Sequence, residues 1–235
     1  MKVRMEELWN DITMEQGSFR LGTDSVLLSQ FITLPKKARV VDLGAGVGTL
    51  GLLLCARDAQ CEVVGVEIDA QANQLACANI DANRLNTRMR AICGDVRQIR
   101  TLLHAGSFDC VISNPPYFPV GSGKAANAAR SELTLNLSQL CQAAAWLLPS
   151  GGRFALVHRP ERLCDIFCSL RENGLEPKRI RFVRHHAHSP VCLVLIEARR
   201  GGSSGLCYEP DFIEFYPDGT ETEEYRAAYH RGETP

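Results

Sequence analysis

The sequence lacks several features that mark specialised classes of protein. No apolar run approaches the roughly 20 residues of a membrane-spanning helix. The first residues, MKVRMEELWND, carry charges where a secretory signal has an apolar core, so we expect a cytoplasmic protein without membrane contact. None of the ten cysteines has CxxC spacing and most stand singly in apolar segments, which predicts small core residues rather than disulfides or metal ligands.

Strong net charge is also lacking, because the formal charge is only −1. A global preference for nucleic acid is therefore not indicated. The charges are nevertheless uneven: residues 151–200 hold 10 basic and 5 acidic side chains, whereas residues 201–235 hold 2 and 8. The basic stretch is interpreted either as a solvated face or as an RNA contact, and it is followed by an acidic tail.

Strand and helix patterns alternate along the chain. Short β-branched runs such as RVVDLGAG, CEVVGVEID and FDCVIS are separated by segments with apolar residues at helical spacing, one of them beginning after Asp69 as a helix N-cap. Such units favour right-handed crossovers and parallel strands. Near the end, KRIRFVRHH and VCLVLIEARR are joined only by AHSP, which is typical of an antiparallel hairpin at a sheet edge.

The predicted fold class is therefore α/β: a Rossmann-like, doubly wound, mostly parallel seven-stranded sheet with an antiparallel C-terminal hairpin and helices on both faces. We expect a single domain over residues 1–235. Within it we distinguish an N-terminal extension with a helix (1–36), the core (37–200) and the acidic tail (201–235).

Polar residues and glycines stand at the ends of four predicted strands, at residues 42–48, 67–69, 94–95 and 113–117. Ligands of doubly wound sheets bind at these carboxyl ends. Each acid alone could be an N-cap or a turn residue. Their occurrence at the ends of three consecutive strands favours a cofactor site.

Two cofactors fit this pattern. Residues 46–51, GVGTLG, match the dinucleotide fingerprint, with Glu67 about 20 residues further on for a ribose. However, Asp42 would place a carboxylate beside the pyrophosphate, and a carboxylate favours a cation. S-adenosylmethionine is cationic and has a ribose for Glu67 and an adenine amine for Asp95. It is the predicted cofactor, and a nicotinamide cofactor is the remote alternative.

The segment NPPY, residues 114–117, follows the strand FDCVIS directly. The side-chain carbonyl of Asn114 and the backbone carbonyl of Pro115 can accept both hydrogens of one amine, which aligns a poor nucleophile for methyl transfer. Pro115 and Pro116 make the turn rigid, and Tyr117 offers a flat face on which a flipped base can stack. The pattern predicts methylation of an exocyclic amine, and a rigid surface turn is the alternative.

Together, VVDLGAGVGTLGLLL, Glu67, Asp95 and NPPY resemble methyltransferases that use S-adenosylmethionine to modify amino or amide nitrogens. Three further segments, FRLGTDSVLLSQF, LEPKRIRFV and VLIEARRGGSSGL, resemble the bacterial tRNA-valine adenine N6-methyltransferase family, over about residues 16 to 220. The resemblance implies methyl transfer to N6 of the adenine next to the anticodon. NPPY is also found in enzymes that act on a release-factor glutamine or on rRNA or DNA bases, and these substrates are the alternatives.

The resemblance also implies roles for individual residues. Asn114, Pro115, Pro116 and Tyr117 would be the catalytic set. The residues implied in cofactor binding are Thr23, Asp24, Asp42, Gly44, Gly46, Gly48, Glu67, Ile68, Asp95, Val96 and Asn114. Thr23 could also be the N-cap of the helix that follows it.

Contacts with RNA phosphates are predicted for Lys124, Arg130, Arg181 and Arg184. His185, His186 and His188 lie in the predicted hairpin link, without cysteine or carboxylate neighbours at ligand spacing. They are expected to be exposed, and no metal site is predicted.

Overall fold

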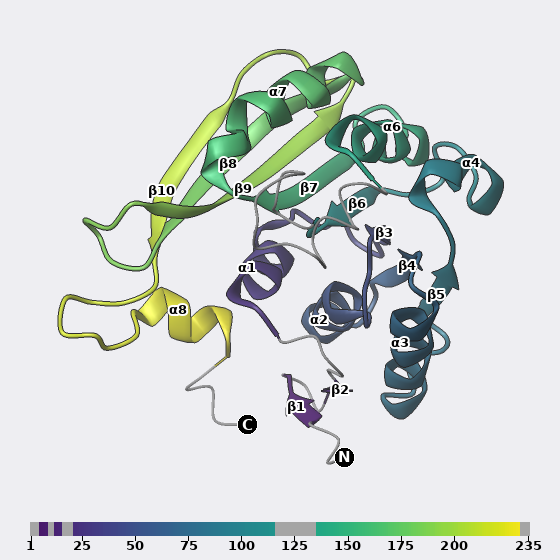
Figure 1. Cartoon of the computed structure of the whole chain (residues 1–235), viewed down its shortest axis with the longest axis horizontal. Helices are drawn as coiled ribbons and strands as arrows, with labels where there is room; N and C mark the ends of the chain where they lie inside the picture. The colour runs from purple at the N-terminus through teal and green to yellow at the C-terminus, as the bar shows by residue number, and fades with distance from the viewer. Residues whose placement is uncertain (1–4, 9–11, 16–20, 116–134, 231–235) are drawn as a thin grey trace, which may run out of the picture.

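The computed structural model describes residues 5–8, 12–15, 21–115 and 135–230. Its centre is an eight-stranded sheet with the order β10-β8-β9-β7-β6-β3-β4-β5 (Figure 1). The strands of this sheet are β3 (Arg39–Leu43), β4 (Glu62–Glu67), β5 (Met89–Cys93), β6 (Cys110–Ser113), β7 (Arg153–His158), β8 (Leu175–Arg184), β9 (Val191–Arg200) and β10 (Cys207–Ile213). Two short strands, β1 (Met5–Glu7) and β2 (Thr13–Glu15), pair antiparallel by themselves.

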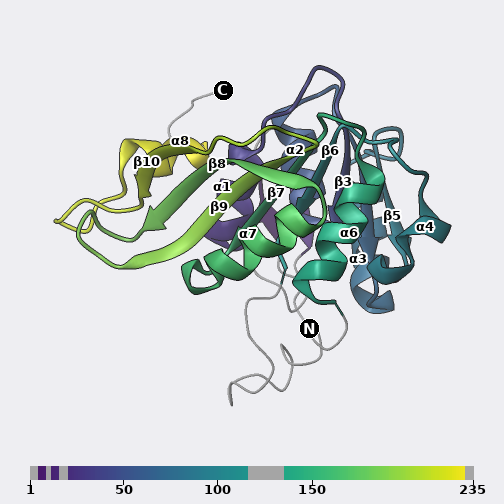
Figure 2. The ribbon, with the colours of Figure 1, turned by 90° about the horizontal axis from the view of Figure 1, so that it is seen from above.

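Helices cover both faces of the main sheet. The helices are α1 (Thr23–Phe31), α2 (Thr49–Arg57), α3 (Ala70–Ala82), α4 (Ile99–Leu102), α6 (Leu137–Leu147), α7 (Leu163–Glu172) and α8 (Glu223–Ala228), with 3-10 turns η1 (Val96–Gln98) and η2 (Pro160–Arg162). Figures 1 and 2 show α4, α6 and α7 on one side of the sheet, and α1, α2 and α3 on the other. Within the described ranges, no helix is long and apolar enough to cross a membrane.

The two-sided burial of the central strands explains the layers. In β3, Val40 belongs to the apolar cluster beneath α1 and α2, whereas Val41 belongs to the cluster beneath α6. A strand buried on both faces is a near-continuous apolar run, as RVVDL is. The predicted N-cap is confirmed: the Asp69 carboxylate accepts hydrogen bonds from the backbone N–H groups of Gln71 and Ala72 at the start of α3.

The predicted Rossmann-like fold and antiparallel hairpin are confirmed, but the strand count is wrong. The sequence predicted seven strands, which correspond to β3 to β9, and the acidic tail supplies an eighth. Strand β10 pairs in parallel with β8, so the β8–β9 hairpin does not form the sheet edge. The segment CYEPDFI contains charges and a proline, and only one of its residues, Phe212, is buried, so no strand pattern was recognised.

Ion pairs explain why the tail is acidic. Its carboxylates meet the basic side chains of β8 and the hairpin, in the pairs Arg179–Glu209 (2.7 Å), Arg184–Asp211 (2.5 Å), Arg181–Glu224 (2.7 Å) and His185–Glu214 (2.5 Å). Three of the ten basic side chains of residues 151–200 are thus paired with carboxylates of the tail. The charge counted within each segment alone therefore does not give the charge of a separate surface, because the two segments lie against each other in the fold.

The cysteine expectation is only partly correct. Four cysteines are buried, namely Cys55, Cys61, Cys110 and Cys141. Five are exposed, namely Cys77, Cys93, Cys164, Cys168 and Cys207. All ten are free thiols.

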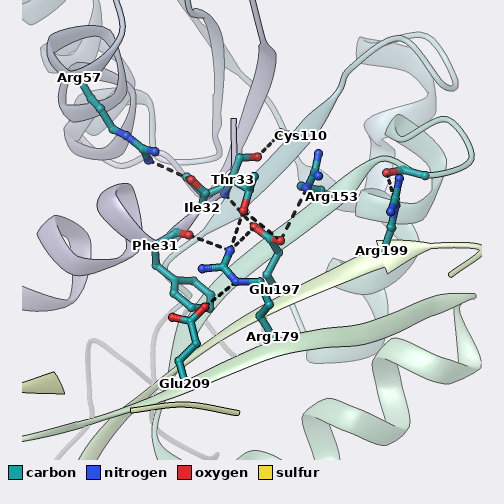
Figure 3. Close-up of polar contacts among 11 residues, drawn as sticks. Phe31, Ile32, Thr33, Arg57, Cys110, Arg153, Arg179, Glu197, Arg199 and Glu209 are labelled. Atoms are coloured by element: carbon teal, nitrogen blue, oxygen red, sulfur yellow. Dashed lines mark hydrogen bonds and ion pairs between the residues drawn. The ribbon is translucent and has the colours of Figure 1, made fainter. Parts of the chain in front are cut away.

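A polar network joins the C-terminal end of α1 to the sheet (Figure 3). The Glu197 side chain on β9 is 6% exposed and accepts hydrogen bonds from the Thr33 backbone N–H (2.8 Å) and from Arg179 (3.2 Å). Arg179 also lies over the Phe31 ring and donates to the Phe31 carbonyl. These contacts fix the helix against the outer strands of the sheet.

Replacement of Glu197 by alanine is expected to lower the free energy of unfolding by about 3 kcal/mol. The substitution leaves the buried Thr33 N–H without its acceptor and removes one of the two carboxylate partners of Arg179, which keeps Glu209, and an unpaired buried group is costly. Chemical denaturation measures this loss. The control is Asp165→Ala, which removes a 62% exposed partner of Arg162. If both variants unfold alike, the buried network does not stabilise the chain.

Candidate active site

The carboxyl ends of β3 and β4 surround a glycine turn. Gly44 and Gly46 have φ angles of +79° and +56°, a conformation that side chains disfavour. A Cβ atom at either glycine would meet nothing within 4 Å, so this side of the turn is open. Gly48 differs, because its Cβ would lie 3.5 Å from the Cβ of Ala76 on α3. Two of the three predicted glycines therefore border open space, and the third serves helix packing.

Asp42 is a buried carboxylate at the end of β3. It is 1% exposed, and neither of its oxygens has a hydrogen-bond partner. Burial, and secondarily the charge of Glu67, raises the pKa of Asp42 to about 8. Buried polar groups in native proteins are almost always paired. A cationic ligand group beside the open turn would supply the missing partner, which fits the predicted cofactor.

Glu67 at the end of β4 holds the turn. Its two oxygens accept hydrogen bonds from the backbone N–H groups of Gly46 (2.8 Å) and Asp69 (2.8 Å). Each carboxylate oxygen has a second acceptor position, so the side chain can still bind a ribose hydroxyl. Ile68 is next to it and 49% exposed, which places an apolar surface at the same strand end.

Replacement of Glu67 by alanine is expected to weaken S-adenosylmethionine binding by about 1.5–3 kcal/mol, the range for hydrogen bonds to charged groups. The variant loses the proposed ribose acceptor and frees the Gly46 N–H. Isothermal titration calorimetry measures the change. Glu62→Ala is the matched control, since Glu62 is exposed at the opposite end of β4. Unchanged affinity in the Glu67 variant would remove this residue from the cofactor site.

Asp95 follows β5, and its carboxylate already has hydrogen-bond partners within the chain. It caps η1 by accepting from the Arg97 backbone N–H (2.9 Å), and it also pairs with the Arg97 guanidinium. The hydrogen bond from the Arg97 side chain lowers the pKa of Asp95, so this carboxylate is ionised and able to accept. Val96 is 6% exposed and packs into the core. The predicted contact between Asp95 and an adenine amine remains a prediction.

Asn114 stands directly after β6, the strand adjacent to β3. In the register between these two strands, Asp42 lies opposite Ile112, two residues before Asn114. The Asn114 side-chain amide donates to the Ser25 hydroxyl (2.9 Å), which joins it to α1. Pro115 follows and is partly buried. Pro116 and Tyr117, the other members of the predicted catalytic set, lie outside the described residues.

The N-terminal end of α1 lies at the same site. Gly22, not Thr23, is the N-cap, so that prediction is wrong. Instead, the Tyr229 hydroxyl near α8 lies 3.0 Å from the Thr23 hydroxyl. Asp24 accepts from the Ser25 backbone N–H (2.8 Å). Sequence reasoning missed Ser25 and Tyr229, because each partner is distant along the chain.

The predicted RNA contacts divide into two groups. Lys124 and Arg130 lie outside the described residues. Arg181 and Arg184 form the ion pairs with the tail given above, and Arg181 also lies over the Phe212 ring. Their positive charge is thus balanced within the chain, and their contact with phosphates stays a prediction.

The hairpin link is exposed at His185, His186 and His188, as expected. Contrary to expectation, His185 has neighbours of metal-ligand type: its side chain and those of Cys192 and Glu214 hold potential ligand atoms within 4.8 Å of one another. His185 Nδ1 is 2.5 Å from Glu214 and forms an ion pair when protonated. Burial raises the pKa of the Cys192 thiol, which disfavours the thiolate that binds metals. That the chain holds no metal remains a prediction.

Several solved structures that share this fold are methyltransferases. A predicted O-methyltransferase from Agrobacterium tumefaciens superposes with a TM-score of 0.75 at 20% identity, covering 89% of this chain and 96% of its own. The geranyl diphosphate C-methyltransferase of Streptomyces coelicolor, solved with S-adenosyl-L-homocysteine, gives 0.57 at 14% identity, over 75% and 76%. These likenesses define the class of fold: the Rossmann-like fold of methyltransferases.

The sequence comparisons define the family. The model of the methyltransferase small domain matches residues 17–166. A relative in Tolumonas auensis, tRNA1(Val) (adenine(37)-N6)-methyltransferase, is 31% identical over 224 residues, which span 87% of this chain and 93% of the relative. The chain therefore belongs to the methyltransferase small domain family, and to the branch of it that contains the tRNA1(Val) adenine N6-methyltransferases. The resemblance inferred from the sequence motifs is confirmed.

Proposed function

We propose that this protein transfers a methyl group from S-adenosylmethionine to N6 of an adenine in tRNA, the adenine next to the anticodon. The name of the relative in Tolumonas auensis supports the substrate. The observation that carries the proposal is the placement of Asn114 directly beyond β6, next to the strand that ends in the unpartnered carboxylate of Asp42. An acceptor for an amine and a partner for a cation thus stand on neighbouring strands.

The residues around the glycine turn fit the proposed cofactor. Asp42 would face the cationic methionine end, with Thr23 and Asp24 nearby on α1, and Glu67 would bind the ribose. Ile68 would pack against the adenine, and Asp95 would accept a hydrogen bond from the adenine amine. Bound there, S-adenosylmethionine supplies an electrophilic methyl group on a sulfonium. The open side of Gly44 and Gly46 gives the backbone room to approach such a ligand.

The residues after β6 would align the substrate amine. The lone pair of an adenine amine is conjugated with the ring, so the amine is a poor nucleophile. Oδ1 of Asn114 and the carbonyl of Pro115 would accept its two hydrogens, direct its lone pair and stabilise the positive charge that develops on nitrogen. Tyr117 would stack on the flipped base, and Pro116 would keep the acceptors rigid. Held in this way, the amine nitrogen could attack the methyl group that the cofactor would supply, and solvent would take the surplus proton from nitrogen.

We also propose that residues 1–235 act as one unit in the cytoplasm, where tRNA is available. Residues 1–36 would supply cofactor contacts through α1. Contacts with tRNA phosphates would be made by Lys124, Arg130, Arg181 and Arg184. At Arg181 and Arg184 the phosphates would compete with the carboxylates of the tail. The contact between Tyr229 and Thr23 supports a role of the tail segment in holding α1 rather than in binding RNA directly.

Transfer of a labelled methyl group tests the proposed function. The protein is incubated with labelled S-adenosylmethionine and, in separate reactions, total tRNA, ribosomal RNA and a release factor. The expected result is label in tRNA alone, with transfer by the Asn114→Ala variant reduced by at least about 100-fold. Label in the release factor or in ribosomal RNA would keep the amine chemistry but contradict the substrate. No label in any reaction would contradict the proposed activity.

A further inference from the structure

The amide of Asn114 is held from a distant part of the chain. Its Nδ2 atom lies 2.9 Å from the hydroxyl of Ser25, 89 residues earlier in the sequence. Ser25 is only 8% exposed, on the first turn of α1. A hydrogen bond that is shielded from water competes less with solvent than an exposed one. The contact therefore restrains the orientation of the Asn114 side chain.

The restraint acts on both ends of the amide. A carboxamide is planar and carries its oxygen and nitrogen on the same carbon, so an anchored Nδ2 fixes the direction of Oδ1. Oδ1 is the atom proposed to accept from the substrate amine. Small displacements of an aligning group lower reaction rates strongly, because the reacting atoms must meet within a narrow range of geometry. The hydroxyl of Ser25 can thus influence turnover without touching the substrate.

Helix α1 is itself fixed at both ends. The Thr23 hydroxyl meets the Tyr229 hydroxyl at its start (3.0 Å). Just after its end, the Thr33 N–H donates to Glu197 in the network of Figure 3 (2.8 Å). A hydroxyl on such a helix has little freedom to follow a moving partner. The Ser25 hydroxyl therefore holds the Asn114 amide in a fixed position.

We infer that Ser25 is a positioning residue for the methyl-transfer step, which directs Oδ1 of Asn114 at the substrate amine. The inference rests on the proposed function, because it assigns Ser25 to the alignment of that amine. It adds a residue outside NPPY and outside the cofactor motifs. It also gives α1 a role in the chemical step in addition to its packing role.

Kinetics of Ser25→Ala test the inference. At saturating tRNA, kcat is expected to fall roughly 10-fold, as for loss of one aligning hydrogen bond, while KM for tRNA and the affinity for S-adenosylhomocysteine stay within about twofold. Ser29→Ala is the matched control. Ser29 is also a buried serine of α1, but its hydroxyl donates to the Val26 carbonyl (2.7 Å). This control should turn over like wild type.

A second measurement separates positioning from folding. In single-turnover reactions with excess enzyme, Ser25→Ala should cause no further loss when it is added to Asn114→Ala, because its partner is already absent. Equal effects in both backgrounds, or a wild-type kcat for Ser25→Ala, would overturn the inference. A parallel fall in cofactor affinity and thermal stability that exceeds that of Ser29→Ala would also overturn it, since it would show a structural role. If wild type itself fails to methylate tRNA, the proposed function fails instead.

Discussion

Asn114→Ala is expected to lower kcat at saturating tRNA by at least about 100-fold, as removal of one preorganised hydrogen-bonding group does in other enzymes. The reason is that the hydrogen bond that Oδ1 is proposed to accept from the amine is strongest in the transition state, when the nitrogen gains positive charge. An interaction made only there changes kcat more than KM. Steady-state methylation of tRNA at several RNA concentrations measures both constants.

Two controls show that the loss belongs to the chemical step. The affinity for S-adenosylhomocysteine should change little in Asn114→Ala, since Asp42 and Glu67 are proposed to hold the cofactor. Asn114→Gln keeps the amide but moves it by one methylene, and it should lose nearly as much turnover, because position matters as well as chemistry. Near-normal turnover of Asn114→Ala would mean that the segment after β6 is only a rigid turn.

Asp42→Asn is expected to weaken S-adenosylmethionine binding by about 1.5–3 kcal/mol and, at the same time, to stabilise the ligand-free protein at pH 8. These opposite effects follow from burial. The pKa of Asp42 is raised from 3.8 to about 8, first by burial and then by Glu67, so the fold disfavours the ionised carboxylate. A cationic ligand favours that ionised form, and asparagine cannot provide it.

The pH dependence of stability has a definite sign. The unfolded chain loses the Asp42 proton above about pH 4, whereas the folded chain keeps it up to about pH 8. The folded state binds more protons between these values, so the contribution of Asp42 to stability falls as the pH rises through this range. Asp42→Asn should therefore equal wild type near pH 4 and exceed it at pH 8, by on the order of several kcal/mol.

Denaturation and calorimetry together measure both effects. Urea unfolding at pH 5 and pH 8 gives the stability difference, with Asp81→Asn on the exposed face of α3 as the control. Calorimetry in buffers of different ionisation enthalpy should show proton release when S-adenosylmethionine binds to wild type near pH 7, and less release in Asp42→Asn. Equal proton release and equal affinity in both proteins would place the cationic end of the cofactor elsewhere.

The sequence predicted the elements that local chemistry determines. Strand β3 is apolar because both faces are buried, and Asp69 caps α3 through its own neighbouring N–H groups. Such features depend on residues close in the chain and are visible without a structure. For the same reason, the polar residues after β3, β4 and β6 predicted the edge at which the candidate site lies.

What the sequence did not predict depends on distant partners. Strand β10 is stabilised by ion pairs such as Arg179–Glu209, 30 residues apart, and its own pattern is too polar for a typical strand. The anchoring of Asn114 by Ser25 joins residues that no motif connects. The Asp42 carboxylate could be placed at a strand end, but its lack of partners is a property of the assembled core.

The most direct test of the proposed reaction uses two tRNA transcripts that differ only at the nucleotide next to the anticodon, adenine in one and guanine in the other. After incubation with S-adenosylmethionine, the RNA is digested to nucleosides and analysed by mass spectrometry. The proposed reaction yields N6-methyladenosine from the adenine transcript and no methylated nucleoside from the guanine transcript. A methyl group at another atom, or equal methylation of both transcripts, would contradict it.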